Sequence, residues 1–145
     1  MLIGNCDEIF NEYLSEYFSW IIQRKLGSEF ALRIMSMSTP RCQELLKLAE
    51  DHVFDIFFLF LNNICFPSDN YAADKSLEKS LQLVTHLRTT YRKPVIALYG
   101  WPRDPSLVAK AKLAGASFAF QAPTKSKELE EAIERCLDML IPSQN

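Results

Sequence analysis

The sequence predicts an α/β fold with a doubly wound parallel sheet, and two observations carry this prediction. Short apolar runs alternate five times with longer segments of helical period, which is the pattern of repeated βα units. The third run, residues 54–61, is apolar on both faces after Asp55, as is typical of a central parallel strand covered by helices. A chain of 145 residues fits one domain, expected to cover residues 1–145.

The five predicted strands are short and cover residues 2–5, 30–35, 54–61, 95–99 and 117–121. Five βα pairs in this length fit the flavodoxin-like strand order 2-1-3-4-5. Ligands of such sheets bind beyond the carboxyl ends of the strands. A site is therefore expected in the neighbourhood of four residues, Asn5, Phe60, Tyr99 and Gln121.

The predicted helices are amphipathic. In the first, spacings of three and four place six residues on one core-facing side: Phe10, Tyr13, Leu14, Tyr17, Phe18 and Ile21. The second begins near the Ser-Thr-Pro start signal at residues 38–40, and the third has its apolar stripe at Leu77, Leu81, Val84, Leu87 and Tyr91. The fourth follows Asp104 and ends at Gly115, and the fifth begins near Ser126.

Composition and charge exclude several kinds of partner. The formal net charge of -2 gives no electrostatic reason to bind nucleic acid or anionic lipid. No apolar stretch approaches the length of a membrane-spanning helix, and the first residues lack the features of a secretory signal. We therefore expect a cytoplasmic protein with neither a nucleic-acid nor a membrane partner. The four cysteines form no Cys-x-x-Cys pair, so no metal site is predicted.

Three segments resemble the receiver domain of bacterial response regulators, and the likeness covers nearly all of the chain. They are residues 54–63, 93–100 and 114–123, with the sequences FDIFFLFLNN, KPVIALYG and AGASFAFQAP. The resemblance implies a CheY-like fold and a place in two-component signal transduction or a phosphorelay.

The resemblance also implies that the phosphate chemistry of receivers has been lost. Receivers place an acidic pair after the first strand, a phosphate-accepting aspartate after the third, and a hydroxyl residue and a lysine after the fourth and fifth. The corresponding residues here are Asn5, Cys6, Phe60, Tyr99 and Ala122. Phosphoryl transfer needs positioned charge around the developing negative oxygens, so phosphorylation is not expected at this site. No cofactor is predicted.

The first strand has one alternative alignment with receivers. A shift of two residues would put Asp7 and Glu8 at the acidic pair, but it would also place Glu12 in the core of the first helix. The unshifted alignment is therefore preferred, although Asp7 could still reach a cation through water.

The rings of Phe60, Tyr99 and Trp101 are expected to converge at the strand ends and to plug the former phosphate pocket. The alternative is a small-molecule sensor, with a ligand at the strand ends and residues 62–74 as its lid. The lining of that pocket would include Asp7, Asn62, Trp101 and Pro123.

The functional prediction is a degenerate receiver, or pseudo-receiver, that acts through contacts with a signalling or effector protein; a homodimer is left open. There are two candidate surfaces. The first is formed by the late helices and the fifth strand and comprises Lys110, Phe118, Phe120, Lys125, Glu130 and Glu134, and the second is the flank of the first helix with Trp20. For Trp20, the favoured alternative is packing under the last helix. An enzyme is the less favoured class, because glycine-rich phosphate loops and a complete nucleophile elbow are absent from the sequence.

Overall fold

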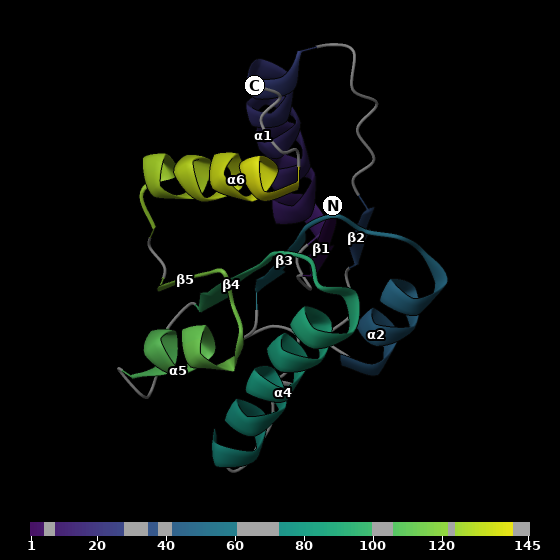
Figure 1. Ribbon diagram of the computed structural model, residues 1–145, viewed down its shortest axis with the longest axis vertical. Helices are drawn as coiled ribbons and strands as arrows, with labels where there is room; N and C mark the ends of the chain where they lie inside the picture. The colour runs from purple at the N-terminus through teal and green to yellow at the C-terminus, as the bar shows by residue number, and fades with distance from the viewer. Residues whose placement is uncertain are drawn as a thin grey trace.

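A central parallel sheet organises the molecule (Figure 1). The computed structural model describes residues 1–4, 8–27, 35–37, 42–60, 73–99, 106–121 and 124–140. Within these residues the sheet has the strand order β2-β1-β3-β4-β5, with neighbouring strands parallel. The strands are β1 (Leu2–Gly4), β2 (Met35–Met37), β3 (Phe57–Phe60), β4 (Val95–Tyr99) and β5 (Phe118–Gln121). The helices are α1 (Glu8–Leu26), α2 (Cys42–Asp51), α4 (Ala73–Tyr91), α5 (Leu107–Ala114) and α6 (Ser126–Leu140).

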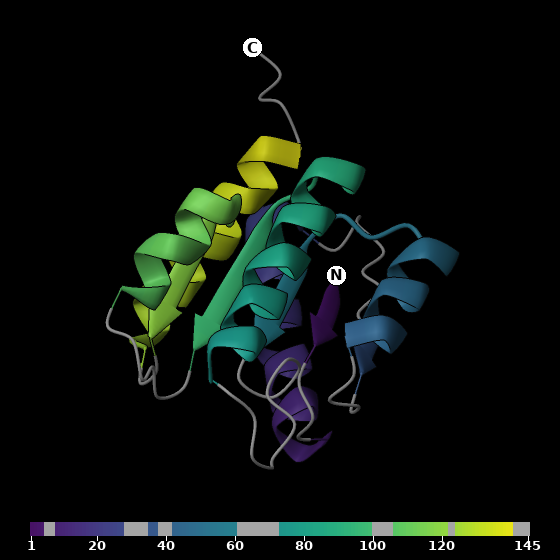
Figure 2. The same ribbon diagram turned by 90° about the horizontal axis from the view of Figure 1, so that it is seen from below.

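Helices cover both faces of the sheet, which gives three layers. Figure 2 shows α2, α4 and α5 on one face and α1 and α6 on the other. The first core cluster lies under α2, α4 and α5 and includes Leu45, Val84, Leu87, Leu107 and Ala111. The second core cluster lies under α1 and α6 and includes Leu14, Phe18, Ile21, Ile133 and Cys136. The predicted α/β fold, a parallel sheet covered by helices, is confirmed.

Strand β3 supplies side chains to both clusters because successive residues of a strand point to opposite faces. Phe57 and Leu59 pack in the first core cluster, and Phe58 packs in the second. The Phe58 ring meets Phe18 of α1 edge-on, with centroids 4.9 Å apart. Burial of each such side chain stabilises the fold by about 1.5–3 kcal/mol. An apolar run with no polar face is thus the sequence that this central position requires.

Three predicted boundaries differ from the structure. The third strand was expected from residue 54, but β3 begins at Phe57. The second strand was expected at residues 30–35, but β2 is Met35–Met37, and residues 30–34 lie outside the described part. Its position follows from pairing with β1, where Leu2 faces Met35, and an apolar run does not indicate where such pairing begins. The predicted loop at residues 62–74 ends earlier, because α4 begins at Ala73.

The predicted core of α1 is correct for Leu14, Phe18 and Ile21, which are buried. It is wrong for Tyr13, whose side chain is 65% exposed. Tyr13 lies at the margin of the apolar stripe, beyond the part of α1 that the sheet and α6 cover. Periodicity locates the centre of a buried face better than its width.

Gly115 ends α5, as predicted. Its φ of 121° is a conformation that side-chain-bearing residues rarely adopt, and its N–H donates to the carbonyl oxygen of Lys112 at 3.1 Å. A Cβ at this position would come within 3.1 Å of the Arg88 side chain. Glycine therefore serves both the turn and the close approach of α4 to α5.

Candidate functional site

The carboxyl ends of the strands form one edge of the sheet, where the sequence places the candidate site. Phe60 ends β3 and is paired in register with Leu98, while Tyr99 ends β4 and is paired with Gln121. The other predicted site and pocket residues lie outside the described residues: Asn5, Cys6, Asp7, Asn62, Trp101, Ala122 and Pro123.

Phe60 and Tyr99 do not converge, contrary to the prediction. Phe60 is partly buried against the second core cluster, whereas Tyr99 is fully buried in the first. Phe60 pairs with Leu98 of β4, and their side chains lie on the same face of the sheet. Tyr99 is the next residue along β4, so its side chain points to the opposite face. The Phe60 and Tyr99 rings therefore lie on opposite faces of the sheet and do not close a single pocket at the strand ends.

The described strands end at Gly4, Met37, Phe60, Tyr99 and Gln121, and none of these five residues carries a charged side chain. Asp55, the acidic residue that precedes β3, lies at the amino end of that strand, and its Oδ1 is 3.5 Å from Nζ of Lys93. Within the described residues, no three His, Cys, Asp or Glu side chains are grouped so that they could hold a metal ion.

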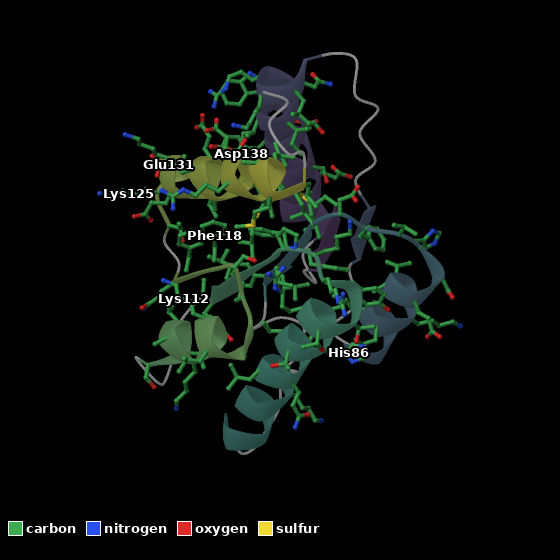
Figure 3. The ribbon with its side chains drawn as sticks, viewed as in Figure 1. His86, Lys112, Phe118, Lys125, Glu131 and Asp138 are labelled. Atoms are coloured by element: carbon green, nitrogen blue, oxygen red, sulfur yellow. The ribbon has the colours of Figure 1, made fainter. Side chains whose placement is uncertain are left out.

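The late-helix surface predicted for a partner is only partly available. Lys110 and Lys125 are exposed, as expected for a contact surface. Phe118 and Phe120 instead pack, partly buried, against the second core cluster, and Figure 3 shows Phe118 between the sheet and α6. They therefore contribute to the core at the edge strand β5 more than to an outer surface.

Glu130 and Glu134, also predicted for the partner surface, are half-buried and face α1. Both form ion pairs with Arg24, and the Glu134 Oε1 lies 3.0 Å from the Arg24 Nη2. Lys25 forms a further pair with Asp138, at 3.1 Å. Because α6 packs across α1, its acidic flank serves an internal helix contact and not the partner surface that was predicted.

Trp20 lies on the surface, so the expectation that it packs under the last helix is wrong. Its side chain is 52% exposed. The indole stacks on Tyr17 with a centroid distance of 6.3 Å and an interplanar angle of 22°, and the guanidinium carbon of Arg24 lies 4.5 Å from its centre. Sequence reasoning missed Arg24, although its spacing of four from Trp20 places both on one side of the helix.

The same fold occurs in solved receiver domains. The signal receiver domain of a DNA-binding response regulator from Colwellia psychrerythraea 34H superposes with a TM-score of 0.67 and 17% identity, over 94% of this chain and 96% of that one. The receiver domain of an HD-domain-containing protein from Pseudomonas fluorescens Pf-5 gives 0.63 and 19%, over 95% and 93%. A response regulator receiver protein from Pseudoalteromonas atlantica gives 0.66 and 12%, over 97% and 98%.

At these identities the likeness is one of fold. No protein-family model and no curated protein matches the sequence. Among the described helices, none combines the length and apolar character needed to cross a bilayer. The three structural neighbours are themselves receiver domains or receiver proteins.

Proposed function

We propose that this chain, residues 1–145, is one receiver-like domain that acts through protein contacts without being phosphorylated. In this proposal it is a pseudo-receiver of bacterial two-component signalling and works in the cytoplasm, with a signalling or effector protein as its partner. It is not an enzyme, and it binds neither nucleic acid nor membrane.

The observation that carries this proposal is Phe60 at the end of β3. By its resemblance to receivers, this position would hold the aspartate that accepts phosphate. An aromatic hydrocarbon packed against the second core cluster offers neither a nucleophile nor a metal ligand. The fully buried Tyr99 supports the same conclusion, because its ring occupies core volume instead of presenting a small hydroxyl residue to a phosphoryl group.

A titration with magnesium and beryllofluoride, a phosphoryl mimic, tests the loss of the phosphate switch. Thermal unfolding of the full chain is followed with and without the reagents, with a phosphate-accepting receiver domain measured in parallel. A ligand present at 100 times its dissociation constant stabilises a folded protein by about 2.7 kcal/mol, which corresponds to on the order of 10 °C for a domain of this size. We expect a shift in the control domain and none in this protein.

A saturable, magnesium-dependent stabilisation would contradict the proposal. It would show that carboxylates such as Asp7, Glu8 or Asp55 rebuild an acidic site. Substituting each of these three residues by Asn or Gln would then identify the carboxylate responsible.

A further inference from the structure

Two exposed aromatic side chains mark one flank of α1. Tyr13 is 65% exposed and Trp20 is 52% exposed. They are seven residues apart, which is about two helical turns and roughly 10 Å along the axis, so they lie on the same side of the helix. Glu16 is exposed between them, three residues after Tyr13 and four before Trp20. Exposed aromatic side chains in a row are enriched at protein interfaces.

Trp20 is held in place before any partner arrives. Its indole lies between the Tyr17 ring and the Arg24 guanidinium, and Arg24 is fixed in turn by Glu134 of α6. Tyr17 is tied to α6 as well, since its hydroxyl donates to the carbonyl oxygen of Ser126 at 3.3 Å. A preorganised aromatic side chain loses little conformational entropy on binding, which is a property of the residues that dominate interface energetics.

Exposed carboxylates lie on α1 beside these two aromatic residues and on the neighbouring α6. Glu12 and Glu16 are exposed on α1, and Figure 3 shows Glu131 and Asp138 along the same outer side of α6. We call this surface the acidic-aromatic face and define it as Tyr13, Trp20, Glu12, Glu16 and Glu131. The neighbouring cations Arg24 and Lys25 are already paired with Glu134 and Asp138 of α6. The face then has three exposed carboxylates, Glu12, Glu16 and Glu131, against two exposed cations on α6, Lys127 and Arg135.

We propose that the acidic-aromatic face binds a basic amphipathic segment of a partner protein, one that combines Arg and Lys with apolar side chains. Its apolar residues would cover Tyr13 and Trp20, and its cations would meet the unpaired carboxylates, with Glu16 at the centre. Arg24 already shows that a guanidinium packs on this indole. The proposal rests on the proposed function, since it names the partner chemistry of one surface through which the domain acts.

Charge also argues against two other occupants. Nucleic acid would bring phosphates against carboxylates. A second copy of the chain, paired with α1 antiparallel about a twofold axis midway between Tyr13 and Trp20, would bring the two Glu16 carboxylates together. A basic protein segment meets neither penalty.

Fluorescence anisotropy with two labelled peptides tests the proposal. The probe is an 18-residue amphipathic helix of Leu, Lys and Arg, and its control has the same Leu pattern with Glu at the charged positions. We expect saturable binding of the basic peptide and none of the acidic one. Trp20→Ala is expected to weaken binding at least ~10-fold, as for a central aromatic anchor. Glu16→Lys is expected to weaken it about 3- to 10-fold and to reduce its dependence on salt.

Matched control variants separate this face from general surface effects. Leu113→Ala removes an 89% exposed apolar side chain from α5, on the other side of the sheet, and Glu50→Lys makes the same charge change on α2. Both are expected to leave affinity within about twofold, as for residues outside an interface. Glu16→Lys changes a solvent-exposed side chain and so keeps the test valid if Trp20→Ala disturbs folding, which circular dichroism checks.

Three results would overturn the proposal: no binding of the basic peptide, equal binding of the acidic peptide, or equal losses in the Trp20 and Leu113 variants. A concentration-dependent dimer that Trp20→Ala abolishes would assign the face to a second copy instead. None of these results would change the beryllofluoride titration, so failure of this proposal and failure of the pseudo-receiver proposal can be told apart.

Discussion

Replacing Tyr99 by threonine would introduce the small hydroxyl residue that the proposed resemblance to receivers places at this position, and we predict that it costs stability without producing a phosphate response. Tyr99 is fully buried in the first core cluster together with Ala97, Leu107 and Ala119. Small alanine neighbours on β4 and β5 leave the space that the ring fills. Removing a fully buried aromatic ring costs about 3–5 kcal/mol, part of it for the cavity left behind. Threonine retains some of that volume, so about 3–4 kcal/mol is expected.

The free energy of unfolding is measured by urea denaturation followed by circular dichroism, for Tyr99→Thr and for Tyr13→Thr. The second variant is a matched control, because it makes the same chemical change at a side chain that is 65% exposed. We expect it to cost less than ~1 kcal/mol. Tyr99→Phe, which removes the hydroxyl and keeps the ring, is expected to cost about 0.5–1.5 kcal/mol. Equal losses at positions 99 and 13 would refute the assignment of the Tyr99 ring to the core.

Three further predictions concern the helices. Gly115→Ala should destabilise the fold by about 1–3 kcal/mol, because the residue has a φ of 121° and the new methyl group would meet the Arg88 side chain. Gly27→Ala should cost less, because Gly27 has a φ of 82° and open space around it. Thermal unfolding of the two variants compares these costs. Arg24→Ala should cost less than about 1 kcal/mol, because its ion pairs are substantially exposed, and high salt should reduce the difference from the unchanged protein. Burial raises the pKa of the Cys136 thiol from 9.0 to about 12. The stability that the protonated thiol contributes is therefore complete below pH 9 and is lost as the pH rises toward 12. Urea titrations at several pH values should show that the free energy of unfolding falls more steeply at alkaline pH in the unchanged protein than in Cys136→Ala.

Elements with two agreeing signals were predictable from sequence. The last helix starts at Ser126, as predicted from its apolar spacing and the acidic residues of its first turns, such as Glu128. Strand β4 covers residues 95–99, where a continuous apolar run follows Pro94. Strand β4 lies between β3 and β5 in the sheet, and the apolar side of α6 packs on the sheet. Local pattern and tertiary packing impose the same requirement on such residues.

The surface of α1 could not be predicted in the same way. Tyr13 and Leu14 are adjacent in the sequence and both belong to the apolar stripe, yet one is 65% exposed and the other 4%. Adjacent helical residues point about 100° apart, so spacing alone does not show which margin of the stripe is left exposed by the sheet and by the crossing of α6. The same crossing pairs Arg24 with Glu134 and so removes that glutamate from the predicted partner surface.

The crossing of α1 and α6 also constrains the order in which the nascent chain can fold. Tyr17 and Ser126 are 109 residues apart in sequence, and Arg24 and Glu134 are 110 apart. At a synthesis rate of about 5–20 residues per second, α1 waits roughly 5–20 s after it is made for the helix that covers it. During that interval Phe18 and Ile21 lack part of their native cover. A ribosome-bound chain halted before α6 should therefore expose this apolar stripe to chaperones. Chaperones should dissociate from the stripe when the last helix emerges from the ribosome.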